Sequence, residues 1–177
     1  WFKCRARDTF ISLPGLTLSI EENDYFELVM KTAMRGYYEF MEGKPLTVHI
    51  TEIEMPDVPL WAIWALQQYA KETSKEECYK KYGQFIKDVI HFIQDNKHPN
   101  LKLMENGLLY TDGKDKAVTW MKSTANGRPV VPRTGYIVEF NALWYNALCF
   151  CASLAEIAGD EASQQKLLAS AEITKKS

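Results

Sequence analysis

The chain has few of the features that mark nucleic-acid-binding or membrane-spanning proteins. Its 21 lysine and arginine residues are nearly balanced by 23 aspartate and glutamate residues, and the cations form no tract that would follow a phosphate backbone. The purely apolar runs fall well short of the roughly 20 residues that a transmembrane helix needs. We therefore expect neither nucleic acid nor a membrane as a partner.

Cysteine and histidine are scarce. The four cysteines, Cys4, Cys78, Cys149 and Cys151, form no C-x-x-C pair and have no histidine at ligand spacing, so the sequence gives no support to a zinc site. We expect them to be buried free thiols. None of the histidines accompanies a Ser or Cys nucleophile. We predict that all three lie at the surface: His49, His91 and His98.

The chain is rich in apolar and aromatic residues. With 177 residues and 46% hydrophobic residues it is long enough to form one domain around a real core. Aromatic residues make up 12%, with five tryptophans, and Trp and Tyr also form the platforms on which sugar rings stack. The opening residues, WFKCRARDTF, have no initiator Met and no polar lead-in. We expect residues 1–177 to be one partial domain from a longer protein.

Hydrophobic residues recur mainly with the helical period, which predicts an all-α protein. Ser19 with Glu22 and Ser74 with Glu77 resemble capping boxes, and Asp57 is placed to cap a third helix. The predicted helices cover residues 21–41, 57–72, 75–96, 138–158 and 160–176.

The order of these helices predicts an architecture. Helices 57–72 and 138–158 are apolar nearly all round, and each is followed by a helix with one polar face, which indicates helical hairpins stacked in two layers. Residues 43–55 are expected to be extended. Residues 97–137 hold four glycines and three prolines and show no helical period; a connection of this length usually carries function. Because no repeat is visible, a closed toroid is favoured over a solenoid.

Three polar clusters lie at the starts of the segments predicted to be inner ones. Carboxylates beside aromatic rings suit sugar binding, because a carboxylate accepts hydroxyl hydrogen bonds while an indole covers the apolar face of the ring. The clusters are Arg7 with Asp8, Asp57 with Trp61, and Trp120 with Arg133 and Glu139.

Each cluster also has a purely structural interpretation. Asp57 would then be only a helix cap, and Arg7 with Asp8 only a local ion pair. Trp61, like Trp144, would be a core residue. A glutamate in the first turn of a helix, such as Glu139, is stabilised by the helix dipole with or without a ligand.

Three stretches resemble the glucosidase domain of glycogen debranching enzymes. TWM followed by VVPRTGYIVEFNALWYNAL is similar to a TWMD segment and the TPR-x-G-x-PVEI-x-ALWYNAL stretch of that family. RDTFISLPGLTL resembles its GRDT segment, although Ala6 replaces the glycine, and DVPLWAIWALQQY resembles its D-x-x-LWF segment. The three occur in the family's order and span the chain to about Gly159.

The resemblance implies a glucoamylase-like toroid of six helical hairpins, (α/α)6, of which this chain holds part. It also implies hydrolysis of α-1,6-linked glucose at a glycogen branch stub, with inversion, without metal or other cofactor, and in the cytoplasm. The mechanism needs two carboxyl groups roughly 6.5–9.5 Å apart. By position, seven residues would line the glucose subsite: Arg7, Asp8, Asp57, Trp61, Trp120, Arg133 and Glu139.

One departure from the family concerns catalysis directly. The family's general acid is the aspartate of TWMD, and Lys122 stands in that place. An ammonium with a pKa near 10 is a poor proton donor at neutral pH. Asp112 or Asp115 would be a weak substitute, and the second catalytic carboxylate is expected beyond Ser177. Three hypotheses follow: a debranching-type hydrolase, a non-catalytic α-glucan-binding relative, and a helical scaffold without a ligand.

Overall fold

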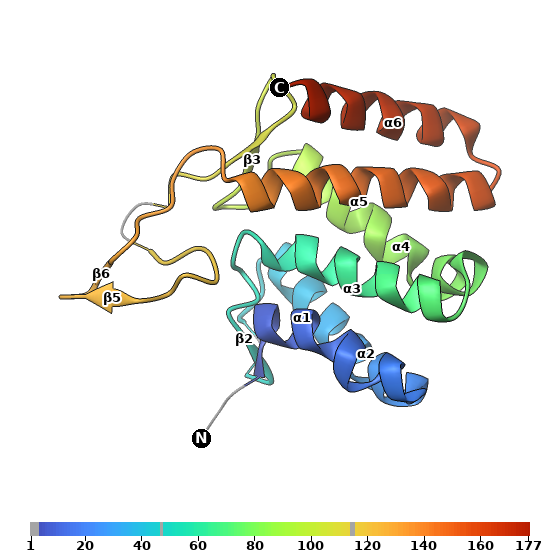
Figure 1. Cartoon of the computed structure of the whole chain (residues 1–177), viewed down its shortest axis with the longest axis horizontal. Coiled ribbons are helices and arrows are strands. Elements are labelled where there is room, and N and C mark those ends of the chain that lie inside the picture. The colour runs from blue at the N-terminus through green and yellow to red at the C-terminus, as the bar shows by residue number, and fades with distance from the viewer. Residues whose placement is uncertain (1–3, 47, 114–115) are drawn as a thin grey trace.

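The computed structural model describes residues 4–46, 48–113 and 116–177, and these residues form six α-helices joined as three hairpins (Figure 1). The all-α prediction is therefore confirmed. The helices are α1 (Ala6–Leu16), α2 (Asn23–Met41), α3 (Val58–Glu72), α4 (Lys75–Gln94), α5 (Val138–Ile157) and α6 (Glu161–Lys176), with a short 3-10 helix, Leu18–Ile20, between α1 and α2.

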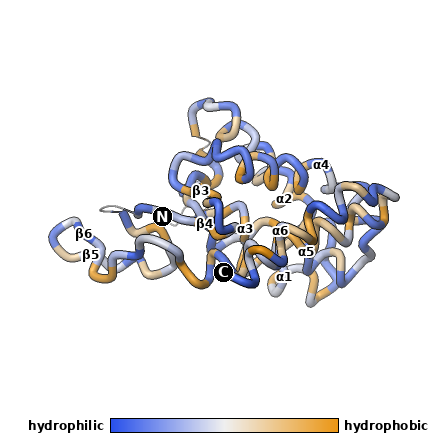
Figure 2. Tube along the Cα trace, turned by 90° about the horizontal axis from the view of Figure 1, so that it is seen from above, coloured by the Kyte–Doolittle hydropathy of each residue, from blue (hydrophilic) through white to orange (hydrophobic). Residues whose placement is uncertain are grey.

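Helices α1, α3 and α5 form the inner row, because α3 packs between α1 and α5. Helix α4 covers α3 and α5, α2 packs on α4 through aromatic contacts such as Tyr37 with Phe85, and α6 runs back along α5. Seen from above, α2 and α4 lie on one side of the molecule and α1 and α5 on the other (Figure 2). The predicted order, a buried helix followed by an amphipathic partner, is confirmed.

The connections that join one hairpin to the next lie at the end of the molecule where α1, α3 and α5 begin (Figure 1). Strand β1 (Cys4–Arg5) pairs in parallel with β2 (Ile50–Thr51), which holds the starts of α1 and α3 side by side. The long connection between α4 and α5 forms two antiparallel hairpins: β3 (Lys102–Leu103) with β4 (Leu109–Tyr110), and β5 (Thr124–Ala125) with β6 (Arg128–Pro129). The β5–β6 hairpin projects from the helical body (Figure 2).

The structure differs from the sequence prediction at the N-terminal hairpin. Helix α1 was not predicted; it contains Pro14, which removes one helical hydrogen bond and lies two residues before the end of the helix. The predicted Ser19 cap is wrong, since its hydroxyl donates to the Gly15 carbonyl at 2.5 Å and α2 begins at Asn23 without a side-chain cap.

The other helix starts agree better with the sequence. Ser74 caps α4 by accepting a hydrogen bond from the Glu77 amide at 3.0 Å, and Asp160 caps α6 through the Ser163 amide. The predicted Asp57 cap is wrong: Asp57 precedes α3 but makes no capping hydrogen bond, because both of its carboxylate oxygens accept from Arg7.

Two cysteines and one histidine differ in burial from the prediction. Cys78 and Cys151 are buried free thiols as expected, whereas Cys4 is exposed and Cys149 half-buried. His98 is buried, not at the surface, and packs its ring edge-on against Phe40 and Phe92. Among the described residues, no helix is both long and apolar enough to cross a membrane.

Candidate functional site

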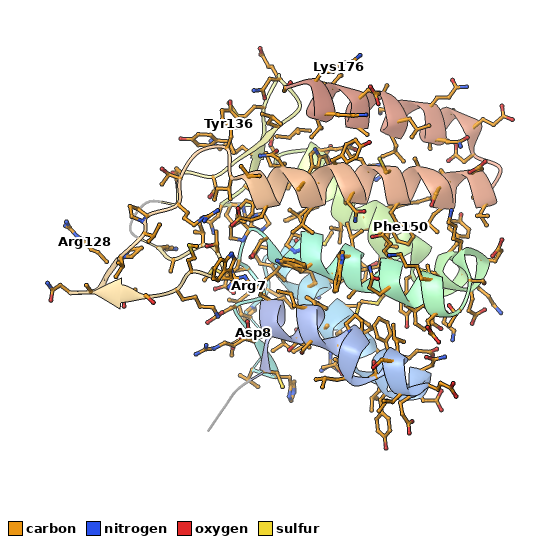
Figure 3. The ribbon with its side chains drawn as sticks, in the orientation of Figure 1. Arg7, Asp8, Arg128, Tyr136, Phe150 and Lys176 are labelled. Carbon is orange, nitrogen blue, oxygen red and sulfur yellow. The ribbon has the colours of Figure 1, made fainter. Side chains whose placement is uncertain are left out.

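The predicted site residues lie where the inner helices begin. Figure 3 shows Arg7, Asp8 and Tyr136 at the end of the molecule from which α1, α3 and α5 start, with Arg128 farther out on the projecting hairpin. Three segments that are far apart in sequence meet here: the start of α1, the β2–α3 connection and the loop before α5.

Arg7 and Asp57 form a buried, two-pronged ion pair. Arg7 Nε donates to Asp57 Oδ2 at 2.6 Å and Nη2 donates to Oδ1 at 2.8 Å, while Nη2 also lies 3.3 Å from the Val118 carbonyl oxygen. The two residues are 1% and 2% exposed. Burial raises the pKa of the Asp57 carboxyl, and the hydrogen bonds and charge of Arg7 act in the opposite direction. The pair joins the starts of α1 and α3 to the long connection between α4 and α5.

Lys122 lies among carboxylates. Its Nζ donates to Glu52 Oε2 at 2.8 Å and lies 3.8 Å from Asp8 Oδ2. The other Glu52 oxygen is 3.6 Å from Arg5 Nε. Glu52 reaches this position from a left-handed backbone conformation, with φ of 61°, which is uncommon for a residue with a side chain and is often found at functional sites. Lys122 thus connects the long loop to the starts of α1 and α3.

Arg133 and Glu139 form a second ion pair, at the start of α5. Arg133 Nη2 donates to Glu139 Oε2, and Nη1 lies 3.4 Å from the Met121 sulfur. The other carboxylate oxygen, Glu139 Oε1, is buried and has no hydrogen-bond partner among the described residues. Buried polar atoms are normally hydrogen-bonded, so this oxygen is an available acceptor beside a cation.

The tryptophans take three different positions. Trp144 is buried in the core, as its structural interpretation predicts. Trp61 is half-buried and packs edge-on against Trp64 with ring centroids 5.6 Å apart. Trp120 is 60% exposed. Trp120 and Trp61 therefore retain indole surface that a ligand can contact, whereas Trp144 does not.

Only one of the two substitute acids lies among the described residues. Asp112 is exposed and follows β4, beside a small hollow that Pro99 and Lys102 also line. Asp115 lies outside the described residues. Within the part of the chain that the structure describes, no three His, Cys, Asp or Glu side chains are grouped so that they could hold a metal ion.

Sequence reasoning missed Glu52. It carries no motif of its own and is separated from Lys122 by 70 residues, so no local pattern connects the two. Of the predicted residues, Arg7 joins Asp57 and Arg133 joins Glu139, whereas Asp8 lies near Lys122 and does not form the local pair with Arg7 that its structural interpretation required.

Chemically, this end of the molecule offers partly exposed carboxylates, indole surface and cations that are mostly paired. Asp8, Glu52 and Glu139 are the carboxylates that are not deeply buried, and such groups accept hydrogen bonds from sugar hydroxyls. The position of the expected acid holds an ammonium group that donates to Glu52. The arrangement is therefore suited to binding a neutral, hydroxyl-rich ligand.

Comparison with known proteins agrees with the sequence motifs. A model of the family described as amylo-alpha-1,6-glucosidase matches residues 1–176. No curated protein and no solved structure matches the chain. Since the family match covers nearly the whole sequence, this chain belongs to the amylo-alpha-1,6-glucosidase family.

Proposed function

We propose that the chain supplies the glucose-binding part of a debranching-type glycoside hydrolase, which releases α-1,6-linked glucose from the branch stubs of an α-glucan. The observation that carries the proposal is Glu139: one carboxylate oxygen is paired with Arg133, and the other is buried without a partner among the described residues. A sugar hydroxyl would satisfy this acceptor. Half-buried Trp61 and exposed Trp120 would cover the apolar faces of the ring.

The proposed reaction is inverting hydrolysis by two carboxyl groups. The subsite would be supported by Arg7, Asp57 and Trp61. Arg7 and Asp57 are buried, so they would position the residues of the subsite rather than contact glucose. Asp8, Trp120, Arg133 and Glu139 would contact glucose. We further propose that the three hairpins are part of a larger (α/α) toroid in a cytoplasmic enzyme. Exposed apolar side chains on α1, the 3-10 helix and α2 support the larger ring: Ile11, Leu16, Ile20, Tyr25 and Leu28.

A second function, glucan binding without hydrolysis, is favoured by the contacts of Lys122. Its ammonium donates to Glu52 and lies near Asp8, so the place of the family's acid holds a cation that is paired with carboxylates. A positive charge there would not stabilise an oxocarbenium-like transition state.

One experiment separates the two functions. The longer protein that includes the rest of the proposed toroid is incubated with a glycogen limit dextrin, and both glucan binding and glucose release are measured for the wild type, Lys122→Asp and the control Lys122→Met. Glucan binding without glucose release by the wild type, together with release by Lys122→Asp at least about a hundredfold above that of Lys122→Met, supports the non-catalytic function, since a general acid contributes at least that much.

Glucose release with Lys122 in place would establish hydrolysis and exclude the non-catalytic function. A folded protein that neither binds nor cleaves the glucan would contradict both. The scaffold hypothesis is supported if Trp61→Ala and Glu139→Ala lower the thermal stability but bind the glucan with the same affinity as the wild type.

A further inference from the structure

The long connection between α4 and α5 carries two tyrosines that the predicted glucose subsite does not include: Tyr110 in β4 and Tyr136 just before α5. Tyr136 is 48% exposed, and its ring centroid lies 5.5 Å from that of half-buried Tyr110, with the ring planes at 77°. We propose that these two residues, the tyrosine pair, are a stacking platform for a glucose residue of an α-glucan beyond the predicted subsite. This inference rests on the proposed function and extends it from one glucose residue to a chain.

The backbone on either side of the tyrosine pair is fixed by hydrogen bonds. Thr111 and Gly135 exchange two backbone hydrogen bonds, at 3.1 and 2.6 Å. The side chain of Asn141, in the first turn of α5, accepts from the Leu109 amide at 2.7 Å and donates to the Leu109 carbonyl at 3.1 Å. An aromatic ring on a fixed backbone loses little conformational freedom when a ligand binds, which favours affinity.

The tyrosine pair is next to the predicted subsite along the chain. Tyr136 follows Arg133 and precedes Glu139 by three residues each. It lies at the same end of the molecule as Arg7 and Asp8 (Figure 3). A glucan whose terminal glucose contacts the Arg133–Glu139 pair would therefore have its next residues in the neighbourhood of Tyr136.

The chemistry of the exposed surface indicates a saccharide. Exposed apolar groups are concentrated in two regions, and concentrations of this kind usually mark a binding surface. The region on α1, the 3-10 helix and α2 is aliphatic except for Tyr25, which suits packing against other helices. The region around the start of α5 combines three valines with two aromatic rings, and rings with polar edges suit the alternating apolar faces and hydroxyl rims of sugars. Its exposed members are Trp120, Val130, Val131, Tyr136 and Val138.

Binding measurements with chains of different length test the inference. Tyr136→Ala is compared with Tyr136→Phe, which keeps the ring, and with Tyr25→Ala, which removes a 61% exposed tyrosine from α2. Affinity for glycogen, maltoheptaose and glucose is measured by calorimetry or by electrophoresis in glycogen-containing gels. We expect Tyr136→Ala to bind glycogen and maltoheptaose about tenfold more weakly, a loss of about 1.4 kcal/mol. Affinity for glucose should be unchanged. Tyr25→Ala should bind like the wild type, and Tyr136→Phe, which keeps the ring face, should lose less affinity than Tyr136→Ala.

The outcomes distinguish this inference from the proposed function. If the wild type binds glucan and Tyr136→Ala binds equally well, the tyrosine pair is not a glucan contact and the proposed function stands. If Tyr25→Ala weakens binding as much as Tyr136→Ala, the effect is not specific and the inference is again overturned. If the folded wild type binds no glucan at all, the proposed function fails and the inference fails with it.

Discussion

Arg7 and Asp57 are both withdrawn from solvent, so each charge depends on the other for its stabilisation. The guanidinium donates two hydrogen bonds to the carboxylate, at 2.6 and 2.8 Å. The pair holds the starts of α1 and α3 together and also reaches the backbone of Val118. A buried charge that loses its partner keeps its desolvation cost, which is why removing one member is more harmful than removing both.

We therefore expect Asp57→Asn to lower the free energy of unfolding by about 3–5 kcal/mol, because Arg7 is left buried without a counter-charge. Urea denaturation followed by circular dichroism measures the change. Asp8→Asn, at the adjacent exposed carboxylate, is the matched control and should change stability by less than about 0.5 kcal/mol. Equal effects of the two substitutions would show that the buried pair has no special role in stability.

His98 is the second residue whose burial has a measurable consequence. Burial lowers its pKa to about 4. Its Nδ1 accepts from the Asn100 amide at 3.1 Å, and its Nε2 is buried without a hydrogen-bond partner among the described residues. The ring packs edge-on against both Phe40 and Phe92, an environment that disfavours the charged imidazolium.

This low pKa predicts acid sensitivity. In the unfolded chain the imidazole has a pKa of about 6.5, so as pH falls below that value the unfolded state takes up the proton first and stability decreases. The loss should reach about 3 kcal/mol near pH 4 and then level off. The free energy of unfolding of His98→Gln should lack this component, whereas that of His91→Gln, at an exposed position, should retain it. A wild type and His98→Gln with parallel pH profiles would contradict the prediction.

At the scale of the elements, helix starts depend on more than the local sequence. Ser74 and Ser19 both precede a glutamate by three residues, yet only Ser74 caps a helix. The difference arises because the chain after α1 forms the 3-10 helix Leu18–Ile20, in which Ser19 is an interior residue. A capping motif predicts a helix start only when the residues before it are free to be extended.

The β3–β4 hairpin is attached to the last helix. Thr174 of α6 donates from its hydroxyl to the Gly107 carbonyl at 2.8 Å, and Ser177 donates to the Asn106 carbonyl at 2.7 Å. Gly107 has a φ of 77°, and a Cβ there would lie 2.6 Å from Ile173 Cγ2. The contact between hairpin and helix is therefore too close for any side chain at position 107.

We expect Gly107→Ala to destabilise the protein by about 2–3 kcal/mol, combining the left-handed backbone with the steric overlap. Gly127→Ala is the control: its φ is 76°, but nothing lies within 4 Å of the added Cβ, so only the backbone term of about 1 kcal/mol should remain. Thermal unfolding by calorimetry measures both. If the two variants lose equal stability, the hairpin yields to the added methyl group and the packing on α6 is not tight.

At the scale of the whole molecule, three hairpins place their inner helices in one row with all three starts at the same end. This parallel arrangement brings together segments that are distant in sequence, since Arg7 and Asp57 are 50 residues apart and Lys122 and Glu52 are 70 apart. The edge of the molecule that α1 and α2 form exposes apolar side chains. That edge is where we propose that a larger toroid continues.

The sequence by itself determined the helical class, the apolar inner helices and the family, because helical periodicity and the TWM and ALWYNAL motifs are local properties of the chain. The helix predicted after residues 57–72 to have one polar face is α4, and Phe85, Ile86 and Val89 on its apolar face are buried.

Only the tertiary structure decided which charges meet. Arg7 bonds to Asp57 and not to neighbouring Asp8, Glu52 pairs with Lys122, and Tyr136 packs against Tyr110. These partners depend on the register with which the hairpins pack, and register is set by the shape of the whole core, which no short stretch of sequence contains.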